Sequence, residues 1–310
     1  MGNTPLDDDL HETMARFSAA AHAKPIALPE LVPPGKVLIA IDRSNQDAAT
    51  LGIGAEVCRR LKATAVLTVA APGLDAQTRQ AYLAEAQGKL GVASEVAPAA
   101  DDADPANCIL AAKQAAGAKF IVMDAPYLED IGRLGRDSVG STAERVLARA
   151  SVPVLFVREP RENPAACLAK PLVKLHFTES DAPHAIAEAF RIGGRGRFRM
   201  LFVIDAAAIH EAVAILRTEV APERLTDTAL LHDAQVAAGS LVATAQRYAK
   251  DHGLDLTVDF KLGSEPDVSA REANDGGHLL VLPCPRDRNT AAYSRALTVL
   301  RLSTMPVLMV

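Results

Sequence analysis

The sequence predicts an α/β protein of two tandem domains, each an open sheet of five parallel strands flanked by helices. Short apolar runs without polar alternation are typical of parallel strands that are buried on both faces. Here such runs alternate with helical segments along the chain, which is the order expected for a parallel sheet with helices on both sides. The length of 310 residues suits two domains, at roughly 150 residues for each.

The first half contains the clearer pattern, beginning with an apolar run that ends at Asp42. Pro105 lies in the first turn of an expected helix, where its missing N–H costs nothing. The expected strands are 37–41, 65–70, 93–97, 119–123 and 152–157. The expected helices are 46–61, 75–90, 105–116 and 142–149.

The second half repeats this order. Residues 150–157 resemble residues 303–310, and residues 117–123 resemble residues 276–282, so two copies of one α/β unit are the simplest explanation. The expected strands are 172–177, 199–204, 256–261, 278–282 and 307–310. The expected helices are 183–191, 206–217, 228–252, 266–274 and 291–302.

Proline-rich and mixed-charge stretches divide the chain. Residues 1–35 form an N-terminal extension in which 6–21 could be a short helix, and prolines then block regular structure up to Gly35. We expect a first domain at 36–158 and a second at 171–310, joined by a linker that contains two prolines.

Composition and charge exclude several classes of protein. The net charge is −5, and the acidity lies in the extension, so no basic face for nucleic acid is expected. Aromatic residues are 4% and Trp is absent, which speaks against base stacking on a single strand. No apolar run reaches the ~20 residues of a membrane helix. Four dispersed cysteines predict reduced, buried thiols, and Asp7 to Asp9 replace the basic start of a secretory signal, so we expect a cytoplasmic protein.

The candidate site lies beyond the carboxyl ends of the strands, where open α/β sheets bind ligands. Asp42 follows the first strand and could hydrogen-bond a ribose hydroxyl. Glycines between the fourth strand and the last helix let the backbone approach phosphates, and the helix start offers N–H groups, hydroxyls and a positive dipole end. The candidate binding residues are Asp42, Gly132, Gly135, Gly140, Ser141 and Thr142.

The opening strand with Asp42 and Ser44, the glycine-rich loop, the Gly140–Ser141 helix start and the strand 152–157 resemble the universal stress protein family. The resemblance covers the first domain well and the second more faintly. It implies a β-α-β-α-β-α-β-α-β fold of the adenine-nucleotide-hydrolase-like type, in which tandem members occur. Nucleotide-binding members carry an Asp after the first strand and then G-x2-G-x9-G-[ST]. The resemblance therefore assigns Asp42 to the ribose and adenine and Gly140 with Ser141 to phosphate, and it implies ATP or AMP, with Mg²⁺, as ligands.

The sequence departs from that motif at several positions. Counted back from Gly140, the family glycines fall on Tyr127 and Asp130. Aligned from the end of the fourth strand, the first glycine position holds Asp124, whose carboxylate would repel phosphate unless a cation intervened. In the second half the counterpart of Asp42 falls at about Phe177, and no glycine follows the fourth strand, so nucleotide binding of the family type is not expected there.

Three functions remain open from the sequence. The first is a cytoplasmic stress-response protein that binds ATP or another adenine nucleotide in its first domain as a regulatory ligand. The second is a nucleotide-free tandem scaffold of the same fold, and the third is a slow, metal-assisted nucleotide hydrolase that uses Asp124. Because no catalytic constellation and no metal-binding spacing is present, an enzyme is not expected, although a weak ATPase stays open.

The expected partners follow from the repeat and the resemblance. The two halves are expected to pair within one chain as a family homodimer would, with strands 152–157 and 307–310 near the interface. The sequence is also compatible with a homodimer of the whole chain, and it indicates neither a nucleic-acid partner nor a membrane partner.

Overall fold

The computed structural model describes residues 27–71, 73–98, 104–125, 140–158, 164–176, 181–216, 222–284 and 290–310. The expected elements of the first half are present, with ends shifted by one or two residues. The strands are β1 (Lys36–Ile41), β2 (Thr64–Val69), β3 (Ser94–Val96), β4 (Ile121–Asp124) and β5 (Val154–Val157). The helices are α2 (Asp47–Leu61), α3 (Ala76–Leu90), α4 (Pro105–Ala116) and α6 (Ser141–Arg149).

The second half follows the same order after a short 3₁₀ helix, η1 (Pro164–Ala169). The strands are β6 (Pro171–Leu175), β7 (Arg197–Ile204), β8 (Asp255–Leu262), β9 (Leu279–Leu282) and β10 (Val307–Met309). The helices are α7 (Ala182–Gly193), α8 (Ala206–Leu216), η2 (Pro222–Leu225), α9 (Asp227–His252), α10 (Glu265–Gly276) and α11 (Ala291–Leu302). The expected strand 172–177 ends two residues early, at Leu175.

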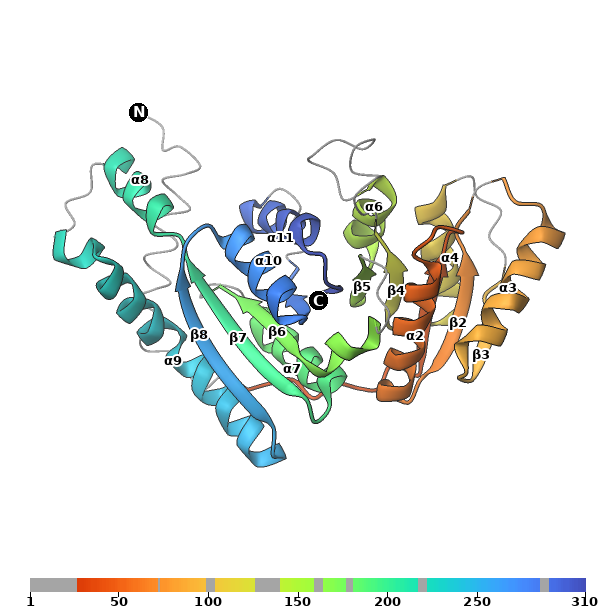
Figure 1. Ribbon diagram of the computed structural model, residues 1–310, viewed down its shortest axis with the longest axis horizontal. Helices are drawn as coiled ribbons and strands as arrows, with labels where there is room; N and C mark the ends of the chain where they lie inside the picture. The colour runs from red at the N-terminus through yellow and green to blue at the C-terminus, as the bar shows by residue number, and fades with distance from the viewer. Residues whose placement is uncertain are drawn as a thin grey trace.

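All strands belong to one ten-stranded sheet in the order β3-β2-β1-β4-β5-β10-β9-β6-β7-β8 (Figure 1). Each half supplies five mutually parallel strands, and β5 pairs with β10 in the antiparallel sense. The expected parallel sheets are therefore confirmed, and the last strands of the two halves meet, as expected. The sequence did not predict that they would join the halves into one continuous sheet.

The junction between the halves has two-fold character. Leu155 of β5 lies opposite Leu308 of β10, and these two leucines occupy the same place in the repeated sequence. When equivalent residues pair across antiparallel strands, a local two-fold axis passes between them. The structure therefore confirms two tandem copies of one α/β unit.

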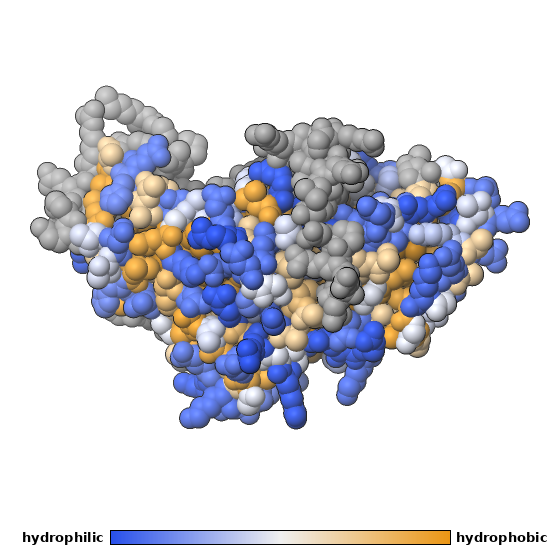
Figure 2. Space-filling view, in the orientation of Figure 1, coloured by the Kyte–Doolittle hydropathy of each residue, from blue (hydrophilic) through white to orange (hydrophobic). Residues whose placement is uncertain are grey.

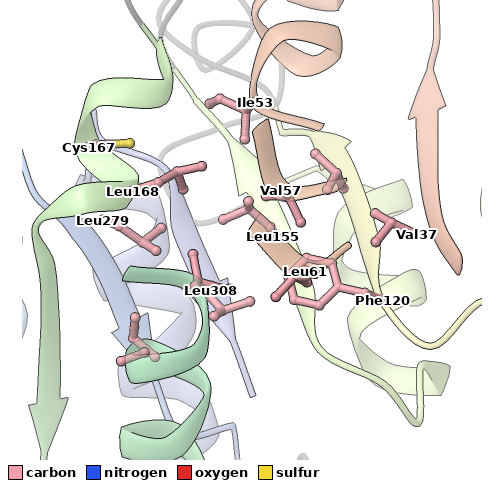
Figure 3. Packing of buried hydrophobic residues seen from close by; sticks show 14 of the residues in the cluster. Val37, Ile53, Val57, Leu61, Phe120, Leu155, Cys167, Leu168, Leu279 and Leu308 are labelled. Carbon is pink, nitrogen blue, oxygen red and sulfur yellow. The ribbon is translucent and has the colours of Figure 1, made fainter. Parts of the chain in front are cut away.

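Helices cover both faces of this sheet and share its hydrophobic core. One buried cluster combines residues of α2, α3, α7 and α9 with one face of the strands, and a second combines α4, α6, α10 and α11 with the other face. Figure 3 shows the first cluster where the halves meet, with Leu61, Leu155 and Leu308 among its side chains. Because each cluster contains residues of both halves, burial of apolar surface stabilises the pairing.

Two arginines bind backbone carbonyls across the junction. Arg60 of α2 donates from Nη1 to the carbonyls of Leu168, Ile192 and Gly193, at 3.3, 3.0 and 3.2 Å. Arg158 follows β5 and is fully buried, and its guanidinium donates to carbonyls at the end of α11. Cations are favourable beside the last carbonyls of a helix, where the dipole is negative. These side chains therefore fix helices of the second half to the first.

Two helical glycines give a sharp test of the packing of α2. A Cβ at Gly54 would lie 2.5 Å from Cδ1 of the fully buried Ile39, whereas a Cβ at Gly239 of α9 would meet no described atom within 4 Å. Gly54→Ala is expected to destabilise the protein by about 2 kcal/mol through overpacking, and Gly239→Ala to stabilise it by about 1 kcal/mol through helix propensity. Urea unfolding measures both. Equal effects of the two substitutions would contradict this close approach of α2 to β1.

Candidate functional site

Two carboxyl groups lie at the carboxyl ends of neighbouring strands. Asp42 directly follows β1 and is exposed, and Asp124 is the last residue of β4 and partly buried. The strands are adjacent and parallel, with Ala40 beside Met123. Burial raises the pKa of Asp124 well above its usual range, and the charge of Asp42 and a hydrogen bond between the two carboxyl groups raise this pKa further. Asp124 is therefore held protonated, and Asp42 carries the negative charge of the pair.

The turn after β1 is held by a buried carboxylate, that of Asp47 in the first turn of α2. This carboxylate accepts the backbone N–H of Asp42 at 3.1 Å and that of Arg43 at 2.9 Å, and the Tyr82 hydroxyl donates to it. Arg43 has a φ of 73°, a left-handed conformation that is unusual for a residue with a side chain. The two backbone hydrogen bonds stabilise this strained turn, so Asp47 positions Asp42 at the end of the sheet.

A second set of hydrogen bonds orients the Asp42 side chain. Its Oδ1 accepts the backbone N–H of Ser44 at 2.9 Å, and the Ser44 hydroxyl in turn accepts the N–H of Gln46 at 3.2 Å. These local turns are typical of Asp and Ser side chains. The Arg43 guanidinium lies over the Tyr82 ring, 5.7 Å from its centroid. The carboxylate of Asp42 is thus preorganised while it remains exposed.

The N-terminus of α6 supplies the other part of the candidate site. Its N-cap is Gly140, with a φ of 92°, and its first residue, Ser141, is exposed, with Thr142 half-buried behind it. A glycine N-cap has no side chain to accept the first N–H groups of the helix, so this end suits an anionic group. Gly132 and Gly135, the other expected phosphate-binding glycines, lie outside the described residues.

Sequence analysis did not single out Asp47 or Tyr82. An Asp in the first turn of a helix is commonly explained by the helix dipole, and the positive φ of Arg43 is a property of the backbone that no motif signals. Tyr82 lies 35 positions from Asp47 in the sequence, on α3. An acidic residue directly after the turn that follows β1 was the available signal for Asp47.

The strand register corrects the counterpart of Asp42 in the second half. Leu38 and Leu172 occupy equivalent positions beside β4 and β9, so the residue equivalent to Asp42 is His176 and not Phe177. The strand β6 ends earlier than the sequence suggested, and this moves the equivalence by one residue. The two halves therefore present different chemistry at the same place in the fold.

Charged side chains cluster around this histidine. Lys174 of β6 forms an ion pair with Glu265 at the start of α10, and Arg295 of α11 approaches the same carboxylate at 3.5 Å. Burial lowers the pKa of His176 to about 4, and the charges of Lys174 and Arg295 act in the same direction, while Glu265 opposes them. His176 is therefore neutral at pH 7.

The described residues also bear on other expectations from the sequence. All four cysteines are free; Cys58, Cys108 and Cys167 are buried, and Cys284 is half-buried, with a pKa raised by burial to about 12. In the described ranges no group of three or more His, Cys, Asp or Glu side chains is placed to hold a metal ion. No described helix combines the length and the apolar character needed to cross a membrane.

Comparisons with known proteins match this tandem doubly wound fold. The model of the universal stress protein family matches residues 34–158, so the first half of the chain belongs to that family. A universal stress protein from Archaeoglobus fulgidus DSM 4304 is 16% identical, with a TM-score of 0.61, over 88% of this chain and 95% of its own. No curated protein matches the sequence.

A second solved structure agrees with the first. A putative universal stress protein from Pseudomonas aeruginosa UCBPP-PA14 is 15% identical, with a TM-score of 0.61, over 89% of this chain and 92% of its own. At these identities the likeness concerns the fold. Since both proteins cover nearly the whole chain, the fold is shared across both halves.

Proposed function

We propose that this protein of the universal stress protein type is cytoplasmic and binds an adenine nucleotide, ATP or AMP, in a first domain of residues 36–158. The nucleotide acts as a regulatory ligand that changes shape or partner choice. The observation that carries the proposal is the preorganised, exposed carboxylate of Asp42, which the Asp47 turn holds at the carboxyl end of β1.

Each part of the site has a chemical role in this proposal. Asp42 accepts hydrogen bonds from the ribose hydroxyls. The glycine-capped N-terminus of α6, with Gly140, Ser141 and Thr142, binds phosphate through backbone N–H groups and hydroxyls. Gly132 and Gly135 are proposed to line the phosphates, and a Mg²⁺ ion that enters with the nucleotide supplies further positive charge.

The protonation of Asp124 supports binding over turnover. An ionised carboxylate beside Asp42 would repel phosphate, but a protonated one removes that charge and donates to Asp42. A protonated carboxyl group is also a poor metal ligand, because metals bind the deprotonated form. Asp124 is thereby less suited to the metal-assisted hydrolysis that the sequence left open.

Calorimetric titration with AMP, ADP and ATP tests the proposal. At least one nucleotide should bind the wild-type protein, and Asp42→Asn should weaken its affinity by about tenfold or more through loss of a charge-assisted hydrogen bond. Asp251→Asn, on the exposed end of α9, removes the same charge and should leave the affinity unchanged. Failure of all three nucleotides to bind, or equal affinity in Asp42→Asn, would favour a nucleotide-free scaffold.

The pH dependence of binding tests the role of Asp124 separately. Since its pKa is raised, the wild-type carboxyl is neutral at low pH and ionises as the pH rises through that pKa. ATP affinity should then fall by about tenfold, because a second negative charge appears beside the ligand. In Asp124→Asn the side chain stays neutral, so the affinity should change little between pH 5 and pH 9. Parallel declines in both proteins would show that Asp124 does not control binding.

A further inference from the structure

The helix α8 is apolar and lacks a packing partner. Its sequence AAAIHEAVAIL contains only two polar residues, His210 and Glu211, yet none of its described side chains, at 206–214, is buried. In Figure 1 the helix stands apart from the sheet at the upper left, and Figure 2 shows hydrophobic residues open at the surface in this corner. Helices that are apolar on all sides are normally buried, so α8 lacks a covering surface.

This projection has no counterpart in the first half. Residues 70–75 connect β2 directly to α3, whereas residues 205–226 connect β7 to α9 and contain α8. The start of α9 at 227–233 also has no buried side chain, and the buried positions of α9 begin at Ala234. The repeated fold therefore does not require α8, and its apolar surface calls for a separate explanation.

The chain itself approaches this side of the molecule before it enters the first half. The carbonyl of Val32 accepts a hydrogen bond from Arg191 of α7 at 3.1 Å, and Leu28 packs against the core cluster that α7 and α9 share. Figure 1 shows this segment running from the side of α7 and α9 toward α2. The preceding residues, 1–26, therefore join the described chain beside the second half.

These residues carry an apolar stripe that matches α8. Leu6, Leu10, Met14 and Phe17 are spaced by four, four and three positions, which places them on one side of a helix. We propose that residues 6–21 dock as an amphipathic helix on the apolar surface of α8 in the same chain. This contact is independent of nucleotide binding.

The length of the segment is sufficient for the contact. A helix over 6–21 would span about 24 Å at 1.5 Å for each residue, and residues 22–26 add up to about 17 Å when extended. The sum is close to the roughly 39 Å length expected for α9, so the segment can reach α8 from any point along that helix. Tethering also raises the effective concentration, so a small contact area is enough.

Photo-crosslinking in the full chain tests the placement directly. A photoreactive amino acid replaces Phe17, and mass spectrometry identifies the peptides it links within the monomer. We expect links to α8 and the start of α9. Links to another surface, or links between two chains, would overturn the proposal, the second outcome by showing that another copy covers α8.

Hydrogen exchange tests the apolar stripe as the cause. In wild type the amides of α8 should be protected, and the double substitution Leu10→Ser with Phe17→Ser should speed their exchange about tenfold. The matched control, His11→Gln with Glu12→Gln, changes residues outside the stripe and should leave exchange unchanged. Exchange from α8 that is equal in all three proteins would overturn the proposal, as would protection that rises with protein concentration.

Discussion

Replacement of Arg158 by methionine is expected to lower the free energy of unfolding by about 3 kcal/mol. The side chain is 0% exposed, and its Nε and Nη2 donate to the carbonyls of Ser303 and Arg301 at 3.2 and 3.1 Å. These carbonyls lie at the C-terminal end of α11, where a helix has no internal donors for its last carbonyls. Methionine fills similar volume but leaves the buried acceptors without this donor, at about 1–3 kcal/mol each.

Arg247→Met is the matched control for this substitution. Arg247 is exposed on α9, so the same change in side chain should alter the free energy of unfolding by less than about 0.5 kcal/mol. Urea denaturation of the three proteins at pH 7 measures the difference. A stability of Arg158→Met within 1 kcal/mol of wild type would show that the guanidinium does not hold α11 to β5.

The wild-type protein is expected to lose about 3 kcal/mol of stability between pH 6.5 and pH 4 through His176 alone. Its pKa falls from 6.5 to about 4 on folding, chiefly through burial. The folded state therefore resists a proton that the unfolded chain accepts. This contribution is fully present above pH 6.5 and is lost as the pH falls toward 4.

His176→Gln removes that titration and should therefore retain about 3 kcal/mol more of its pH 7 stability at pH 4 than wild type does. The groups that face His176, namely Lys174, Glu265 and Arg295, remain in both proteins, so their own titration largely cancels in the comparison. His232→Gln, on the exposed side of α9, should follow the wild-type curve. Urea unfolding at pH 7, 5.5 and 4 provides the data. Identical pH profiles for wild type and His176→Gln would contradict the burial of a neutral imidazole.

Most of the fold could be predicted because its signal is local. The run 37–41 is apolar without alternation, and the structure buries it on both faces as β1, between β2 and β4. The pairing of Leu155 with Leu308 was harder to predict, because it joins positions far apart in the sequence. Internal similarity placed the last strands near each other, but only the register shows that they form one sheet.

The candidate site was predicted less completely. Asp42 follows directly from its place after the first strand. The protonation of Asp124 depends on burial and on a neighbour from another strand, which sequence spacing does not give. The support of the turn by Tyr82 is likewise a tertiary contact. Local motifs therefore locate such a site, and its electrostatics follow from packing.

The antiparallel seam between β5 and β10 has a consequence for how this molecule can diversify. Two separate chains that met at this seam could pair like with like, whereas one polypeptide obliges unlike partners to meet, always in equal number. One half can then keep a carboxylate at the position where the other carries the neutral imidazole of His176. The covalent connection makes the protein a built-in heterodimer, in which one partner is free to specialise without losing the other.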